Sequence, residues 1–224
     1  MVTQSSAKNF KILRASLRKL SETLRYFFLT NMKSITVFCG SSSGFRKEYA
    51  EAAKELGRNL VAQNIRLVYG GGNVGLMGII ADEVMKNGGE VLGIIPESLD
   101  KKEVAHRQIT ELRVVGSMHE RKALMAEFAD GFIAMPGGIG TFEEFFEILT
   151  WAQLGFHHKP CAILNVANYY DGLLSLCDNA VNEGFLRQQH SELILVDSDS
   201  VKLLEKMKNY KPQAVEKWID KENL

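Results

Sequence analysis

Short runs of apolar residues alternate along this chain with longer segments in which apolar residues recur every three or four positions. The short runs predict strands over 35–39, 65–69, 90–95, 112–115, 132–135, 162–164 and 193–196. The longer segments predict helices between the first two strands and over about 75–86, 118–128, 142–154, 170–183 and 199–209, whereas 97–110 is polar and predicts irregular structure. Apolar strands separated by helices predict an α/β fold, a doubly wound parallel sheet covered on both faces. Ligands of such folds bind beyond the carboxyl ends of the strands, so the residues after each strand are the candidates for chemistry.

Residues 1–33 differ from the rest and predict an N-terminal basic amphipathic helical extension before a domain over 34–224. This segment carries seven basic residues and one acidic residue, Glu22, between apolar residues at roughly helical spacing. It could pack on the domain or on a partner subunit, it could touch an anionic surface such as a membrane, or it could be dispensable. The sequence does not choose among these three interpretations.

Composition excludes several classes of protein. Hydrophobic residues make up 46% and charged residues 24%, which is ordinary for a globular protein with a core. Lys+Arg and Asp+Glu both number 27, so the global basic character of a nucleic-acid-binding protein is absent. The net charge is zero because the basic residues of 1–33 offset an excess of acidic residues in 34–224, which hold 20 basic and 26 acidic residues. An anionic substrate must therefore be attracted by local groups.

Two glycine-rich turns follow the first two predicted strands. The first, Gly40-Ser41-Ser42-Ser43-Gly44, offers hydroxyls that suit a phosphate or a ribose, although an ordinary tight turn explains it as well. The second contains Gly70-x-Gly72-x-x-Gly75, the shape of a dinucleotide fingerprint. It is not in the first strand–helix unit, and no acidic residue ends the next strand to hold a ribose. This disfavours NAD binding.

A third turn, Pro136-Gly137-Gly138-Ile139-Gly140-Thr141-Phe142-Glu143-Glu144, precedes a predicted helix. Three glycines in four residues leave bare amides at a helix start, which attract an anion such as phosphate. No Lys-Ser/Thr pair follows, so it is not a nucleoside-triphosphate loop of the Walker type. An equally good explanation is structural, because Thr141-x-x-Glu144 spells a capping box worth ~1 kcal/mol of helix stability.

This third motif, together with Met118-His119-Glu120-Arg121-Lys122 upstream, resembles the LOG family of cytokinin riboside 5′-monophosphate phosphoribohydrolases, which are often labelled lysine decarboxylases. The similarity runs from about Lys33 to Glu183. It implies a Rossmann-like fold, a homodimer and hydrolysis of the N-glycosidic bond of a purine nucleoside 5′-monophosphate, AMP or a cytokinin type, to free base and ribose 5-phosphate.

The resemblance also implies site residues by motif position. It makes Arg121 and Glu144 catalytic. The substrate-binding residues, with Ser41 added from the first turn, are Ser41, Glu103, Arg121, Lys122, Gly137, Gly138, Ile139, Gly140, Thr141, Glu144 and Thr150. Glu103 is the softer match, since it lies in a variable loop.

Helix geometry narrows the mechanism to one carboxylate. Glu143 and Glu144 diverge by ~100° on a helix, so they cannot form the paired carboxylates of a typical glycosidase. We expect Glu144 alone to face the ribose, where its charge stabilises the developing cation or orients water, and Arg121 to hold phosphate or ribose oxygens. Without the resemblance, an ion pair of Arg121 with Glu120 or Glu127 would be favoured, and His119 would be incidental.

Other functions compete less well. A non-catalytic nucleotide or cofactor carrier would need the glycines but not Glu144 with Arg121. A pyridoxal-phosphate-dependent decarboxylase is disfavoured because nothing singles out a Schiff-base lysine. His157-His158 has no matching carboxylate or cysteine spacing, so we expect no metal site. We also expect no cofactor. Cys39, Cys161 and Cys177 predict reduced thiols of a cytoplasmic protein. We expect a small-molecule partner and no nucleic acid.

Overall fold

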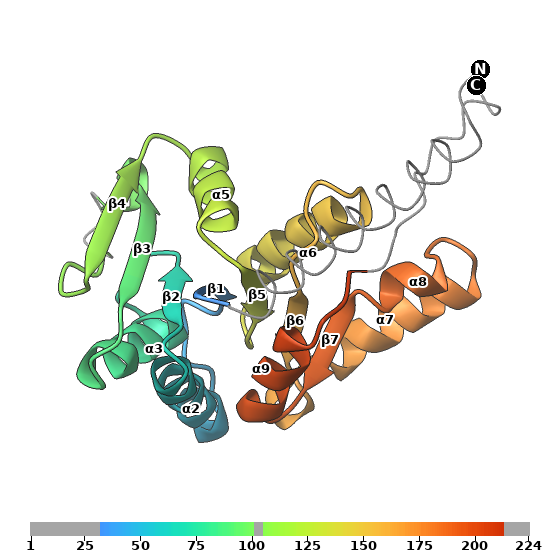
Figure 1. Ribbon diagram of the computed structural model, residues 1–224, viewed down its shortest axis with the longest axis horizontal. Coiled ribbons are helices and arrows are strands. Elements are labelled where there is room, and N and C mark those ends of the chain that lie inside the picture. Colours follow the sequence, from blue (N-terminus) through green and yellow to red (C-terminus); the bar gives the residue numbers. More distant parts are fainter. Residues whose placement is uncertain (1–31, 101–104, 213–224) are drawn as a thin grey trace, which may run out of the picture. The chain divides into compact units, whose positions relative to one another are not determined.

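The computed structural model describes residues 32–100 and 105–212, and its centre is a seven-stranded, fully parallel sheet (Figure 1). The strand order is β4-β3-β2-β1-β5-β6-β7. The strands are β1 (Ser34–Phe38), β2 (Arg66–Tyr69), β3 (Val91–Pro96), β4 (Glu111–Val115), β5 (Gly131–Ala134), β6 (Cys161–Leu164) and β7 (Ile194–Asp197). All seven predicted strands are confirmed, with boundaries shifted by at most one residue.

The chain changes direction across the sheet between β1 and β5. Ile35 of β1 pairs with Leu67 of β2 on one side and with Gly131 of β5 on the other. Successive strands are added outward from β1 as far as β4, and the chain then returns to β5 and proceeds the other way. A crevice for a ligand is expected at such a switch point, beyond the carboxyl ends of the two strands.

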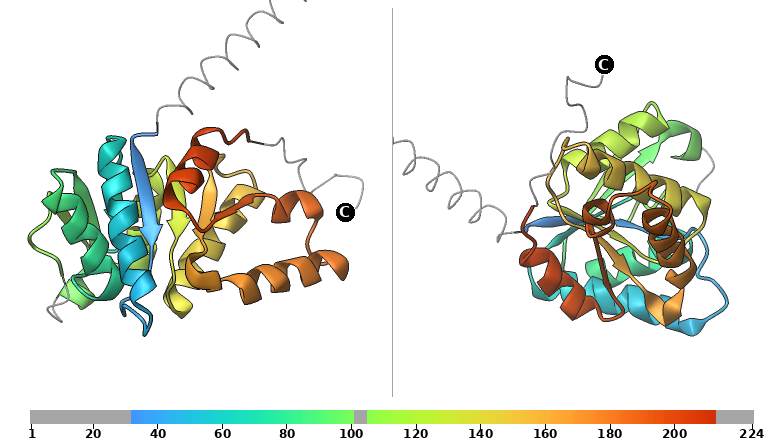
Figure 2. Two further views of the ribbon diagram at one scale, coloured as in Figure 1. Left: turned by 90° about the horizontal axis from the view of Figure 1, so that it is seen from below. Right: turned by 90° about the vertical axis from the view of Figure 1, so that its right-hand side faces the viewer.

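Helices cover both faces of the sheet. One face carries α2 (Lys47–Ala62), α3 (Gly75–Lys86) and α9 (Ser200–Lys208), and Figure 2 (left) looks onto this face. The other face carries α5 (Met118–Glu127), α6 (Ile139–Gln153) and α7 (Asp171–Asn182). Successive residues of the inner strands are therefore both buried, as Leu67 and Val68 are. This double burial is why the inner strands read as continuous apolar runs.

The two outermost strands, β4 and β7, are less buried than the inner strands because each has a neighbouring strand on one side only. β4 alternates in polarity, and its Glu111 pairs with Arg66 (2.6 Å) and Arg113 (2.6 Å). Every residue of β7 is half-buried. Charged side chains on an edge strand discourage further strand pairing.

Three short elements depart from the sequence prediction. α4 (Glu97–Asp100) lies inside the stretch predicted to be irregular, and η1 (Val166–Asn168) and α8 (Gln188–Ser191) lie in predicted loops. Elements of three or four residues are too short to show a periodic pattern. The predicted extension over 1–33 lies almost wholly outside the described residues, so the boundary near 33 stays a prediction. In the described ranges, every helix is too short or too polar to cross a membrane.

Candidate active site

Three glycine-rich turns meet at the carboxyl ends of β1, β2 and β5. The Gly40 amide donates to the Pro136 carbonyl (3.0 Å), and the Gly40 carbonyl accepts from the Leu76 amide (3.0 Å). These bonds join the turn after β1 to the turn after β5 and to the start of α3. The fold thus brings together three motifs that lie up to 100 residues apart in the sequence.

Close backbone approach explains why glycines are needed here. A Cβ atom on Gly75, whose φ is +56°, would lie 2.3 Å from the Ser41 carbonyl carbon. A Cβ atom on Gly137 would lie 2.2 Å from Thr141 Oγ1. Both distances are far inside van der Waals contact, so a side chain at either position would force the turns apart.

A pocket of about 270 Å³ lies between these turns. It is lined by Gly40, Ser41, Ser42, Ser43, Gly44, Tyr49, Leu76, Pro136, Gly137, Gly138 and Tyr169. Three predicted substrate-binding residues, Ser41, Gly137 and Gly138, are therefore in its wall. Serine hydroxyls and glycine backbone form the polar part of the wall, which suits a phosphorylated sugar, and Tyr49, Leu76, Pro136 and Tyr169 form its apolar part.

The start of α6 shows which explanation of the third motif holds. The helix begins at Ile139, with Gly138 as its N-cap and no side-chain cap, so Thr141 lies inside the helix. The predicted helix start at Phe142 was three residues late, and the capping box at Thr141 and Glu144 is wrong. In residues 32–100 and 105–212, no group accepts a hydrogen bond from the amides of residues 138–141. Four free donors at the positive end of a 15-residue helix form a site for an anion.

Arg121 and Glu144 form a buried ion pair beside this helix start. Arg121 Nη2 lies 3.0 Å from Glu144 Oε1, and the two side chains are only 9% and 10% exposed. The guanidinium rests on Gly70, where a Cβ atom would lie 2.1 Å from Nη2. Arg121 Nε is buried and has no hydrogen-bond partner within the described chain. This donor is enclosed by the folded chain, and neither Arg121 nor Glu144 lines the 270 Å³ pocket itself.

Burial governs the protonation of this pair. It raises the pKa of Glu144, while the positive charge of Arg121 partly counteracts the shift. Cys39 at the end of β1 is also buried, and burial raises the pKa of its thiol well above the ordinary range. Cys39 is therefore a neutral neighbour of the two charges.

A variant of the capping box, in which the glutamate reaches the residue before the N-cap, does exist at the start of α5. The Ser117 hydroxyl accepts from the Glu120 amide (3.1 Å), and the Glu120 carboxylate accepts from the Gly116 amide (2.8 Å). Ser117-x-x-Glu120 is the sequence pattern from which this helix start could have been predicted. The cap fixes the first turn of α5 and with it Arg121. Glu120 is thus occupied by the backbone, and Arg121 pairs with Glu144 rather than with Glu120 or Glu127.

The two adjacent carboxylates of α6 point apart, as helix geometry predicted. Glu144 is buried, whereas Glu143 is exposed and lies 2.5 Å from Lys122 Nζ. Glu147 also pairs with Lys122 (3.0 Å). Burial lowers the pKa of Lys122, but hydrogen bonds with Glu143 and Glu147 outweigh this, so the net shift is upward. Lys122 ties α5 to α6, and its contact with substrate stays a prediction.

The remaining predicted residues are spread more widely. Ile139 is 80% exposed at the first position of α6. Thr150 is exposed about 16 Å further along that helix, where its hydroxyl donates to the Phe146 carbonyl (2.7 Å). Within one subunit, Thr150 therefore does not join the cluster. Glu103 lies outside the described residues.

Three other residues considered in the sequence have ordinary surroundings. His119 is exposed, and Trp151 is half-buried and packs against the core. His157 Nε2 lies 2.9 Å from the Ile148 carbonyl oxygen, and burial lowers the pKa of its imidazole. Among residues 32–100 and 105–212, no three His, Cys, Asp or Glu side chains cluster as metal ligands would.

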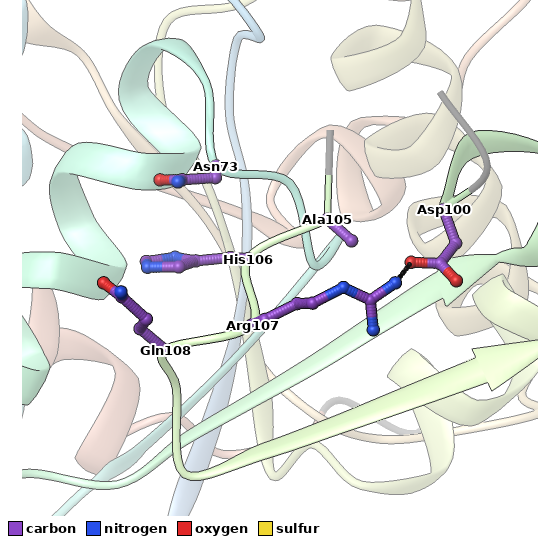
Figure 3. Close-up of a pocket in the computed structure, with 6 residues that line it drawn as sticks. All are labelled: Asn73, Asp100, Ala105, His106, Arg107 and Gln108. Atoms are coloured by element: carbon purple, nitrogen blue, oxygen red, sulfur yellow. Dashed lines mark hydrogen bonds and ion pairs between the residues drawn. The ribbon is translucent and has the colours of Figure 1, made fainter. Parts of the chain in front are cut away.

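A second, larger pocket of about 450 Å³ lies beyond β2 and β3 (Figure 3). It is lined by Asn73, Asp100, Ala105, His106, Arg107 and Gln108. Asn73, His106 and Gln108 point to one side, whereas Arg107 points the other way and pairs with Asp100 (2.6 Å). None of the described site residues predicted from the sequence lines this pocket, so we place the candidate active site at the smaller one.

Comparison with known sequences identifies close relatives. A protein-family model described as possible lysine decarboxylase matches residues 77–207. The chain is 50% identical over 183 residues to the probable cytokinin riboside 5′-monophosphate phosphoribohydrolase LOGL9 of Oryza sativa subsp. japonica, covering 82% of this chain and 81% of that protein. It is 47% identical over 184 residues to the cytokinin riboside 5′-monophosphate phosphoribohydrolase LOG1 of Arabidopsis thaliana, covering 82% and 86%.

Comparison with solved structures supports the fold. The molybdenum cofactor carrier protein of Chlamydomonas reinhardtii superposes with a TM-score of 0.60 at 19% identity, covering 79% of this chain and 96% of that chain. The molybdenum cofactor binding protein of Rippkaea orientalis gives a TM-score of 0.60 at 22% identity, covering 79% and 95%. At this level of identity, the likeness shows a shared Rossmann-like fold alone.

Proposed function

The chain belongs to the LOG family of cytokinin riboside 5′-monophosphate phosphoribohydrolases, and we propose that it hydrolyses the N-glycosidic bond of a nucleoside 5′-monophosphate. One observation in the structure carries the proposal. The buried Arg121–Glu144 pair lies next to a helix start whose four amides have no acceptor in the described chain. A carboxylate in the second turn of the helix whose start would bind the phosphate is an arrangement that suits hydrolysis of a phosphorylated riboside.

We assign the phosphate to the start of α6. The amides of residues 138–141 and the helix dipole favour a dianion there, and Gly138 and Ser41 both line the pocket beside this helix start. Arg121, whose guanidinium is not fully hydrogen-bonded within the described chain, donates to a phosphate or ribose oxygen and holds the sugar near Glu144. The domain is mildly acidic, so these local groups supply the attraction.

We assign the chemical step to Glu144. Water adds to C1′ as the bond to the base nitrogen breaks, and the base leaves with the proton that the water gives up. Positive charge develops on C1′ and the ring oxygen, and the Glu144 carboxylate stabilises it and accepts a hydrogen bond from the water. Arg121 keeps this buried carboxylate ionised against the upward shift that burial gives its pKa.

The carrier alternative is weaker. It is favoured by the likeness to molybdenum cofactor carrier proteins, which rests on fold alone. A carrier uses the glycine-rich turns, but it gains nothing from a carboxylate buried beside the anion site. The relatives at 47–50% identity are named as hydrolases.

A panel of nucleoside 5′-monophosphates tests the proposal. Wild-type protein should release free base from AMP or an N6-substituted analogue, detected by chromatography together with ribose 5-phosphate. Arg121→Ala should abolish release, whereas Glu127→Gln, an exposed acid at the end of α5, should leave it unchanged. Binding of nucleotide without release of base from any member of the panel would favour the carrier.

We propose further that the protein is a cytoplasmic homodimer. Apolar side chains exposed after the end of α6, Leu154 at 51% and Phe156 at 75%, support a subunit interface. Three free, buried cysteines support a reducing compartment. Sedimentation of the wild type and of Phe156→Glu tests the dimer: the substitution should shift the mass toward the monomer, and a wild-type monomer would contradict it.

A further inference from the structure

Three consecutive backbone carbonyls in front of α6 are each held by a hydrogen bond. The Met135 carbonyl accepts from the Tyr170 hydroxyl (2.6 Å), and the Pro136 carbonyl accepts from the Gly40 amide (3.0 Å). The Gly137 carbonyl accepts from the Tyr169 hydroxyl. The amides of residues 138–141 follow directly and donate to nothing in the described ranges. The turn therefore offers its amides to a ligand while its carbonyls are engaged elsewhere.

This arrangement matters for an anion because a carbonyl oxygen repels it. If the Gly137 carbonyl turned toward the pocket, its negative end would oppose a phosphate at the start of α6. Gly137 lacks a side chain that could restrain its peptide group, and glycine backbone is free to rotate. The Tyr169 hydroxyl supplies the restraint.

The backbone before the two tyrosines is strained in a way that positions them. Ala167 and Asn168 have φ values of +50° and +60°, and only Asn64 joins them as a non-glycine residue with positive φ in the described chain. Alanine in this conformation costs roughly 1–2 kcal/mol. Such strain persists where surrounding contacts fix the chain, and it is common next to ligand sites.

The rings and a buried amide supply those surrounding contacts. Tyr169 packs edge-on against Tyr170 (centroids 5.0 Å apart) and against Tyr49 (5.8 Å). The Asn165 side chain accepts from the Tyr170 amide (2.8 Å) and donates to Asp171 (2.7 Å). Both tyrosines are thus held rigidly enough to fix the turn that they contact.

We propose that Tyr169 is a positioning residue for the reaction, because its hydroxyl keeps the Gly137 carbonyl turned away from the substrate phosphate. Tyr170 does the same for Met135, but its ring is only 2% exposed, so it also stabilises the core. Tyr169 is 38% exposed, so its hydroxyl is more separable from folding. The inference rests on the proposed phosphate site at α6.

Tyr169→Phe tests the proposal because it removes the hydroxyl and keeps the ring. We expect KM for the nucleoside monophosphate to rise about tenfold, the effect of one lost hydrogen bond at an anion site, with kcat changed less than twofold. Product inhibition gives the sharper readout. The inhibition constant of ribose 5-phosphate should rise by the same factor, whereas that of the free base should not change.

The matched control is Tyr210→Phe, which removes a hydroxyl from a half-buried tyrosine beyond the end of α9. It should keep the wild-type KM and both inhibition constants. Unchanged KM and unchanged ribose 5-phosphate inhibition in Tyr169→Phe would overturn the proposal. Equal weakening of ribose 5-phosphate and free base would also overturn it, because that pattern indicates general disruption.

A second measurement separates this proposal from the proposed function. Calorimetry with ribose 5-phosphate needs no turnover, so it reports on the anion site even if the protein hydrolyses nothing. Tyr169→Phe should weaken this binding about tenfold relative to wild type, and Tyr170→Phe should weaken it in the same direction with a lower Tm. Equal binding by wild type and both variants refutes the positioning role, whatever the outcome of the activity assay.

Discussion

Replacing Glu144 with glutamine separates the chemical role of this residue from its structural one. Glutamine has the same shape and keeps an oxygen that can accept from Arg121 Nη2, now 3.0 Å from Glu144 Oε1. It removes the negative charge that the transition state needs. We expect kcat/KM to fall about a thousandfold, which corresponds to ~4 kcal/mol of transition-state stabilisation.

The stability of Glu144→Gln follows from two opposing effects. Arg121 is buried, and leaving it without a countercharge destabilises the folded state, by about 3–5 kcal/mol where the partner is removed altogether. The retained oxygen and the relief of burying a carboxylate offset much of this. We expect a net loss of at most ~2 kcal/mol, or a Tm lower by no more than ~8 °C.

The difference in Tm between wild type and Glu144→Gln should depend on pH in a definite direction. Because burial raises the pKa of Glu144, the folded protein binds a proton there more readily than the unfolded chain does. Wild type therefore gains stability relative to Glu144→Gln as the pH falls through the raised pKa, and the difference in Tm should widen between neutral and acidic pH. A difference that narrows would contradict the proposed burial of Glu144.

Two assays decide the outcome: base release by chromatography and thermal unfolding followed by circular dichroism. Glu127→Gln serves as the matched control and should behave as wild type in both. The reasoning would be refuted if folded Glu144→Gln kept a tenth or more of the wild-type kcat/KM. It would also be refuted if the loss of activity came only from unfolding and refolded variant regained full activity.

Four further substitutions test other parts of the site and the fold. Gly70→Ala should lower kcat/KM at least tenfold and also lower Tm, because its methyl group would lie 2.1 Å from Arg121 Nη2 and would push the guanidinium out of its buried pair with Glu144; unchanged steady-state kinetics would be the opposing result. Gly140→Ala should raise the unfolding free energy by about 0.5–1 kcal/mol in urea, since its methyl group meets nothing within 4 Å in a helical segment; an unchanged or lower unfolding free energy would contradict this. Ala167→Gly should raise Tm by a few degrees by relieving the +50° φ, and a lower Tm would show that alanine is not strained there. Glu111→Gln should lower Tm at neutral pH, because hydrogen bonds from Arg66 and Arg113 lower the pKa of Glu111 in the folded protein. The difference in Tm from wild type should vanish as the pH falls through that lowered pKa. A difference that persists in acid would contradict this explanation.

The sheet was predictable because burial on both faces leaves a local signal. In an inner strand such as β3, successive residues point to opposite faces and are both buried, as Ile94 and Ile95 are. The strand therefore appears in the sequence as an uninterrupted run of apolar residues. The edge strand β4 was found from fewer apolar residues, and the short elements α4, α8 and η1 were missed. Their conformations depend on contacts with other segments rather than on a repeating pattern.

The site was predictable in its parts but not in its assembly. The sequence shows Arg121 and Glu144 on separate helices 23 residues apart, and only the folded chain brings their side chains into contact. Two capping boxes were spelled in the sequence, at Ser117 and at Thr141. Only the first is used, because the free amides of α6 begin three residues before Thr141.

Tyr169 had no sequence signal at all. It lies 32 residues from Gly137, and its position depends on a left-handed conformation at Ala167 that the propensity of alanine opposes. Long-range contacts of this kind override local preference, so they are visible only in three dimensions.

The central claim is that this chain breaks the N-glycosidic bond of a nucleoside 5′-monophosphate at the Arg121–Glu144 pair. The most direct test incubates purified full-length protein with AMP and an N6-substituted AMP and measures free base and ribose 5-phosphate in the same samples. We predict that the two products form in equal amounts with wild type and that neither forms with Glu144→Gln. Recovery of intact nucleotide with wild type, or equal product formation by Glu144→Gln, would contradict the claim.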